Sequence, residues 1–201
     1  CVVGQLSAES ICGCFTSTSR QASCNYGIGT DGRVSLCVEE KNRSWCSSSN
    51  ANDQRAVTIE CASDKTEPYA MNSKVYESLI NLCTDICKRN GKKKLLWLGS
   101  KSEALNYSPK SDEMVLTVHR WFANKSCPGN WLYSKLGDLA EKVTENLTGT
   151  TATITTTTTK KETLYRVQVG AYSVKNNADV QLKKVKAAGF DTYMVKVGGL
   201  Y

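Results

Sequence analysis

The sequence predicts an α/β fold, a mixed central β-sheet flanked by helices, over residues 1–147. Apolar side chains recur at helical spacing in residues 73–89 and again in residues 131–147, which indicates two amphipathic helices. Short β-branched stretches lie before and between these helices, and strands that alternate with helices are typical of helices packed on a sheet. With 40% hydrophobic residues in 201, the chain can bury a core of this kind.

The N-terminal half predicts one helix and three strands. Residues 7–15 have helical character, and Ser7 is a suitable N-cap. Residues 24–38 predict a β-hairpin, because two strand-like stretches flank an Asp-Gly turn. Residues 55–61 are β-branched and predict a sheet strand that carries Glu60 near its end.

The helix over residues 73–89 has the clearest signals of the chain. Ser73 can cap its start and Gly91 can end it. Residues 94–98 then predict a short buried strand, and residues 131–147 the second long helix.

His119 is the only histidine of the chain, and Cys127 follows eight positions later. Residues 116–118 predict a short strand that delivers the imidazole, and Cys-Pro-Gly makes a turn that can bring the thiolate back towards it. Imidazole and thiolate suit Zn²⁺, and a catalytic zinc site uses three protein ligands. On these residues alone, a core or surface histidine remains the alternative.

Residues 118–129 read Val-His-Arg-Trp-Phe-Ala-Asn-Lys-Ser-Cys-Pro-Gly. This stretch resembles the distal metal motif of zinc-dependent N-acetylmuramoyl-L-alanine amidases, the type-2 amidases that include phage endolysins and peptidoglycan recognition proteins. The resemblance implies that His119 and Cys127 bind zinc and that Lys125 stabilises the oxyanion. It also places the family's first zinc-binding histidine just before Cys1. The sequence as given is therefore expected to begin in a truncated first strand and to lack one ligand.

A second match concerns the catalytic base. Val-Thr-Ile-Glu at residues 57–60 resembles the family's strand with a glutamate that activates water, so Glu60 is expected to be the general base. As a bare feature, a glutamate at a strand end is more often simply exposed. Cys24 stands where some members carry a catalytic tyrosine, which leaves more of the catalysis to Glu60.

Substrate-binding residues are also implied by the resemblance. Arg-Ser-Trp-Cys-Ser at residues 43–47 resembles the family's groove segment, with Cys46 in place of a histidine. Trp45 is then expected to form a stacking wall for the substrate, although a tryptophan is more often core. Asn25 and Asn52 match polar groove positions.

Ten cysteines are spread along the chain without a Cys-x-x-Cys pair or a regular framework. This pattern indicates neither a zinc ribbon nor a disulfide scaffold. We expect most of them to be free, buried thiols, which fits synthesis in a reducing cytosol.

Residues 148–163 contain ten threonines and few apolar side chains, so they predict a linker. Residues 164–201 predict a βαβ unit. Its Tyr-Arg-Val-Gln-Val-Gly-Ala-Tyr stretch at 165–172 resembles half of a SPOR domain, a peptidoglycan-binding module. Residues 160–201 hold eight basic and three acidic residues, so this tail contributes most of the net charge of +7. We expect it to bind an anionic polymer.

These features together predict a zinc-dependent hydrolase that cleaves the amide between N-acetylmuramic acid and L-alanine at the bacterial cell wall. A phage endolysin and a bacterial autolysin fit equally well, made in the cytoplasm and then released by lysis or secreted. The alternative is a peptidoglycan-binding protein with an incomplete zinc site. Nucleic acid is not favoured as a partner, because no arginine cluster or exposed aromatic run is present, and no apolar run is long enough to span a membrane.

Overall fold

The computed structural model describes residues 4–149, 170–188, 192 and 194. The chain divides into two compact units, Cys1–Thr155 and Thr156–Tyr201. The first unit combines short strands with flanking helices, so the predicted α/β class is confirmed. The two strands predicted in the tail fall almost wholly outside the described residues.

The described strands of the first unit form two small sheets. In the first sheet β1 (Tyr26–Ile28) is central, antiparallel to β2 (Val34–Leu36) and parallel to β3 (Ile59–Cys61). The second sheet pairs β4 (Lys94–Leu96) with β5 (Glu113–Val115) in parallel. The predicted hairpin is present as β1 and β2. The stretch expected to be a strand at 116–118 lies just beyond the end of β5.

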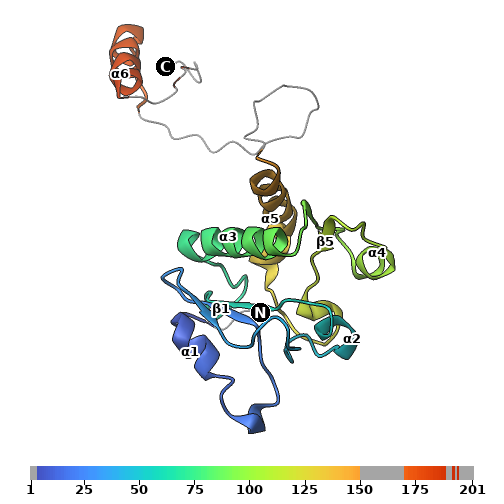
Figure 1. Cartoon of the computed structure of the whole chain (residues 1–201). Helices are drawn as coiled ribbons and strands as arrows, with labels where there is room; N and C mark the ends of the chain where they lie inside the picture. Colours follow the sequence, from blue (N-terminus) through green and yellow to red (C-terminus); the bar gives the residue numbers. More distant parts are fainter. Residues whose placement is uncertain (1–3, 150–169, 189–191, 193, 195–201) are drawn as a thin grey trace. The chain divides into compact units, whose positions relative to one another are not determined.

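Helix α1 (Ala8–Gly13) packs closely on the hairpin (Figure 1). Ser7 caps it as predicted, because its hydroxyl accepts a hydrogen bond from the Ser10 amide at 3.2 Å. The close approach depends on two glycines of the hairpin. A Cβ at Gly27 would lie 2.8 Å from the Ile11 side chain, and one at Gly29 only 2.3 Å from the Ala8 amide nitrogen. Only residues without a side chain allow the helix this position.

The two long helices build the core of the first unit. Helix α3 (Ser73–Arg89) contacts α5 (Asn130–Thr148), and α5 also covers β4. In Figure 1, α3 lies above β1 and α1 below it. The buried side chains recur at helical spacing, which confirms the two amphipathic helices; those of α5 are Leu132, Leu136, Leu139, Ala140 and Val143.

The start of α3 differs from the prediction by one residue. Asn72, rather than Ser73, is the N-cap, and its side-chain oxygen accepts from the Val75 amide at 3.0 Å. We therefore expect Asn72→Ala to lower the free energy of unfolding by about 1 kcal/mol, because the amide of Val75 loses its partner. Ser73→Ala is the matched control and should change it little. Urea unfolding of both variants measures this, and a larger loss for Ser73→Ala would contradict the assignment.

Several short helices are not predicted by the spacing of apolar residues in the sequence. They are η1 (Thr18–Arg20), α2 (Asn50–Asp53), α4 (Lys101–Asn106) and η2 (His119–Trp121). Each has at most six residues, too few for an apolar repeat to show. Serine caps stabilise two of them: Ser49 accepts from the Asn52 amide and Ser100 from the Glu103 amide.

The second unit contains α6 (Lys175–Ala187), close to the predicted helix at 173–188. Ala178 is its buried residue, and Leu182 and Val185 are half-buried. Its other face carries lysines, of which Lys175 pairs with Asp179 at 2.8 Å. No helix among the described residues combines the length and the apolar character needed to cross a membrane.

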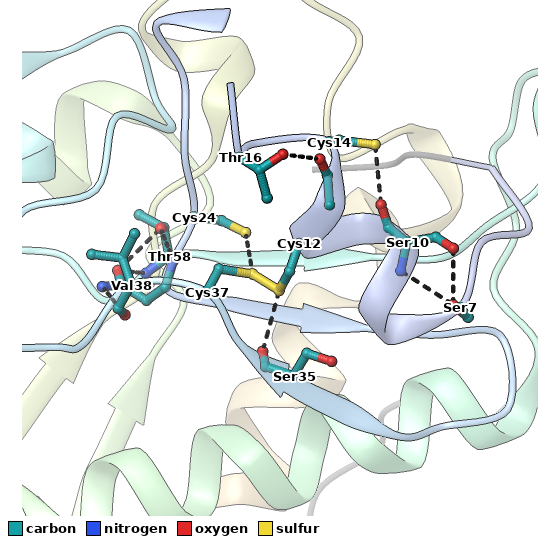
Figure 2. The surroundings of a disulfide bond; sticks show 12 residues. Ser7, Ser10, Cys12, Cys14, Thr16, Cys24, Ser35, Cys37, Val38 and Thr58 are labelled. Carbon is teal, nitrogen blue, oxygen red and sulfur yellow. Dashed lines mark hydrogen bonds between the residues drawn. A yellow bond between two sulfur atoms is a disulfide. The ribbon is translucent and has the colours of Figure 1, made fainter. Parts of the chain in front are cut away.

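One cysteine pair departs from the expectation of free thiols. Cys12 of α1 is bonded to Cys37, which follows β2 (Figure 2). The pair lies 25 residues apart, so it joins the helix to the hairpin on which the helix packs. Six other described cysteines are free thiols, Cys14, Cys24, Cys46, Cys61, Cys83 and Cys87, and four of these are buried as expected.

Candidate active site

The first unit contains a cavity of about 750 Å³. Five residues predicted from the sequence line it, from three separate parts of the chain: Trp45, Glu60, His119, Lys125 and Cys127. The wall also includes residues that sequence reasoning did not single out: Phe15, Arg20, Ser48 and Asp53 are examples. The fold thus gathers the predicted catalytic and metal-binding side chains in one place.

The loop between His119 and Cys127 is closed on itself. The Arg120 amide donates to the Cys127 carbonyl at 3.0 Å, and the Arg120 guanidinium binds the Ser126 carbonyl and Asn130. These bonds return Cys127 to the side of the cavity that His119 occupies, as the turn at Cys-Pro-Gly predicts. Both side chains are half-buried.

His119 is held from both sides. It begins η2, where Trp121 stacks on Trp97 with ring centroids 5.0 Å apart and anchors the turn in the core. Ser48 also lines the cavity, and its hydroxyl lies 3.1 Å from the Nε2 atom of His119. Ser48 has a φ of 63°, an uncommon backbone conformation for a residue with a side chain.

Glu60 lies on β3, opposite Gly27 in the register with β1, and only 5% of it is exposed. It is therefore not the exposed glutamate of an ordinary strand end. The Cys46 thiol donates to its Oε1 atom at 3.9 Å. Burial raises the pKa of Glu60, and negative charge on nearby Cys127 raises it further, while a positive His119 lowers it. A carboxylate whose pKa is raised and which lines the cavity is a stronger proton acceptor than an exposed one.

A buried aspartate in the lining of the cavity holds a neighbouring loop by hydrogen bonds. Asp53 of α2 accepts hydrogen bonds from the Cys46 amide at 3.2 Å and from the Ser47 amide and hydroxyl at 3.1 and 2.6 Å. It thereby fixes the segment that carries Trp45. Its partners lie six and seven residues away in an irregular loop, so no local sequence pattern indicated this role.

Trp45 is on the rim, with 53% of it exposed. The Arg43 guanidinium lies 4.6 Å from the centre of its ring, a cation–π arrangement, and also binds Asn50. Trp45 is thus a surface aromatic beside the cavity rather than a core residue.

The two predicted asparagines lie outside the wall of this cavity. Asn25 is 1% exposed, and its amide bridges the Val38 carbonyl at 3.1 Å and the Thr58 amide at 2.9 Å, so it joins two loops from within. Asn52 donates to Ser47 and accepts from the Thr117 hydroxyl, both at 3.0 Å. It lines a smaller neighbouring cavity of about 140 Å³ that His119 also borders.

The described residues offer metal donors but not a complete set. Among the described residues, no group of three or more His, Cys, Asp or Glu side chains is arranged to hold a metal ion. His119 and Cys127 supply two donors of the type that zinc prefers, on the wall of one cavity. Cys24, a conceivable extra donor, is fully buried, and burial raises the pKa of its thiol far above the ordinary value.

Comparisons with known proteins match two family models to this chain. The family model described as N-acetylmuramoyl-L-alanine amidase matches residues 4–130, more than half of the chain. The model of the SPOR domain matches residues 137–196, beginning within α5. Comparisons with curated proteins and with solved structures returned no match. Residues 4–130 include every side chain named above as lining the larger cavity. The chain therefore belongs to the N-acetylmuramoyl-L-alanine amidase family.

Proposed function

We propose that this chain hydrolyses the amide bond between N-acetylmuramic acid and L-alanine in peptidoglycan, with water activated at a zinc site. The observation that carries the proposal is the meeting of His119, Cys127, Glu60 and Lys125 on one cavity within the segment matched by the amidase family. Incubation with purified peptidoglycan and detection of new L-alanine amino groups tests it directly.

Glu60 is the proposed general base. Its carboxylate receives a proton from the attacking water at the cavity wall and returns it to the leaving amine. Burial and the Cys46 thiol hold the side chain in place, so its orientation does not depend on bound substrate. The raised pKa makes the Glu60 carboxylate a stronger acceptor for the proton of the attacking water.

Lys125 and Trp45 have complementary proposed roles. Lys125 is exposed on the loop between His119 and Cys127, so its ammonium group can approach the oxygen of the tetrahedral intermediate. Trp45 presents an exposed ring on the rim, suited to stacking against a sugar ring or the adjoining peptide.

His119 and Cys127 would hold the zinc ion, together with a third donor from outside the described residues. When bound, zinc lowers the pKa of a coordinated water and polarises the scissile carbonyl. The hydrogen bond between Ser48 and the Nε2 atom would fix the orientation of the imidazole, as partners of ligating histidines commonly do.

The metal assignment makes a prediction that does not depend on activity. His119→Ala and Cys127→Ser each remove a zinc ligand. Each should therefore weaken zinc binding by more than the roughly 10- to 100-fold that is lost when a residue hydrogen-bonded to a ligand is removed. Competition with a chromogenic chelator measures this. Cys87→Ala removes a buried thiol that lines neither cavity and is the control. Unchanged zinc affinity in both ligand variants would place the metal elsewhere.

One observation favours a second candidate function. Since the described residues hold no three-ligand cluster, the chain could bind peptidoglycan without cleaving it. Pull-down with insoluble peptidoglycan and no release of amino groups, with zinc present in excess, would support this alternative.

The SPOR match indicates a second contact with peptidoglycan. We propose that the threonine-rich segment at residues 148–163 is a linker and that residues 164–201 direct the catalytic unit to the bacterial cell wall. Endolysin and autolysin roles both fit this arrangement, with release by lysis or by secretion.

A further inference from the structure

Three sulfur atoms meet where α1 lies against the open end of the β1–β2 hairpin. Cys12 is bonded to Cys37, and the Cys24 thiol lies 3.6 Å from the Cys37 sulfur (Figure 2). Cys24 is fully buried, so this thiol is held against the disulfide by the surrounding core. The distance is close to sulfur–sulfur van der Waals contact.

The open end of the hairpin places Cys37 opposite Asn25, the residue that follows Cys24. Tyr26 pairs with Leu36 in the register, and one residue further on the Cys37 amide donates to the Asn25 carbonyl at 2.8 Å. Cys37 therefore has two possible sulfur partners. Cys24 belongs to the same hairpin, whereas Cys12 comes from α1.

We propose that Cys37 is shared by two mutually exclusive disulfides, and that Cys12, Cys24 and Cys37 form a thiol–disulfide exchange site. The Cys24 thiolate attacks the Cys37 sulfur, the Cys24–Cys37 bond forms, and the Cys12–Cys37 bond breaks. Cys12 leaves as a thiolate and takes up one proton, which balances the proton lost by Cys24. The number of disulfides is unchanged, so the step needs no oxidant or reductant.

The buried position of Cys24 keeps this step slow in the resting protein. Burial and the nearby negative charges of Glu60 and Cys46 raise the pKa of Cys24, so little thiolate is present. The Cys12–Cys37 bond is then the resting form, and the exchange is an infrequent event.

The exchange changes how the cavity wall is anchored. Residues 14–23 connect α1 to Cys24 and supply Phe15 and Arg20 to the wall. The Cys12–Cys37 bond fixes the N-terminal end of this segment to the hairpin. After exchange, Cys24–Cys37 fixes only its C-terminal end. The site therefore couples the sulfur pairing to the order of one cavity wall, whatever reaction the cavity performs.

Labelling with N-ethylmaleimide tests the exchange in the intact chain without reductant. Cys12 becomes reactive only after Cys24 has displaced it, and labelling then traps the Cys24–Cys37 form. Mass spectrometry of peptides from an acid-quenched digest identifies the labelled Cys12 and the Cys24–Cys37 disulfide. We expect time-dependent label on Cys12 in the unsubstituted chain and in the control Cys87→Ala, and at least roughly tenfold slower label in Cys24→Ala and Cys24→Ser.

Two results would overturn the proposal. The first is an unlabelled Cys12 in the unsubstituted chain long after the exposed Cys14 has reacted completely. The second is equal labelling of Cys12 with and without Cys24, which would show that another thiol opens the bond. The first result needs no variant, so the test does not depend on whether Cys24→Ala folds.

The effect on the cavity wall has its own readout. Cys12→Ser, oxidised in a glutathione buffer, should contain the Cys24–Cys37 bond. Trypsin should then cut after the exposed Arg20 roughly tenfold faster than in the unsubstituted chain, because the segment has lost one anchor. A reduced Cys24 and Cys37 in this variant, or an unchanged cleavage rate in the bonded form, would contradict the coupling.

Discussion

Glu60→Gln is expected to lower the rate of amide cleavage by roughly 10²- to 10⁴-fold, the usual contribution of a general base. The amide of glutamine keeps the shape of the side chain but accepts no proton. Because Glu60 is 5% exposed and receives the Cys46 thiol, a near-isosteric change should leave the backbone of β3 in place. The measurement is release of L-alanine amino groups from peptidoglycan, beside retention of the variant on insoluble peptidoglycan.

A matched control is available on the second sheet. Glu113 of β5 is 6% exposed and accepts from the Tyr107 hydroxyl at 2.7 Å and the Lys110 amide at 2.9 Å. Glu113→Gln removes an equally buried carboxylate away from the cavity and should keep most of the activity. If Glu60→Gln cleaved at the rate of this control, Glu60 would not be the base.

Gly29→Ala is expected to have the largest effect on stability. The new Cβ would lie 2.3 Å from the Ala8 amide nitrogen and 2.9 Å from the Ser7 carbonyl carbon, and both are backbone atoms that cannot rotate away. Either α1 moves off the hairpin or the hairpin distorts, at a cost of about 3 kcal/mol or more. The midpoint of urea unfolding measures the loss.

Gly13→Ala is the control for this substitution. A Cβ at Gly13, the last residue of α1, meets no atom within 4 Å, and alanine favours a helix more than glycine does. We expect equal or slightly higher stability. A Gly29→Ala protein as stable as Gly13→Ala would show that α1 does not need this close approach.

Features that depend on residues close together in the sequence were predictable, and features that depend on distant residues were not. The long helices were predictable because Leu79 and Cys83, or Leu139 and Val143, repeat every turn and face the same core. The sequence predicts the cap of α3 one residue late, because Asn72 and Ser73 both suit the position and only the backbone conformation distinguishes them.

The candidate site shows the same limit. The spacing of His119 and Cys127 lies within one loop, so a local motif contained it. The burial of Glu60 depends on the packing around β3. The hydrogen bond that Asp53 accepts from the Cys46 amide depends on an irregular turn. The Cys12–Cys37 bond joins residues 25 apart without a repeating framework, so nothing in the sequence distinguished that pair from the other cysteines.

The buried face of α5 decides where this protein can be divided. The SPOR match begins at residue 137, yet Leu139 and Val143 are 1% and 0% exposed within the core of the first unit. A chain ended at the start of that match would remove Leu139 and Val143 from the core that α3 and α5 share. The helix ends at Thr148, and Gly149 follows in a left-handed conformation that terminates it. A separate catalytic unit, or a graft of another wall-binding module onto it, therefore needs the whole of α5 and its junction after Gly149.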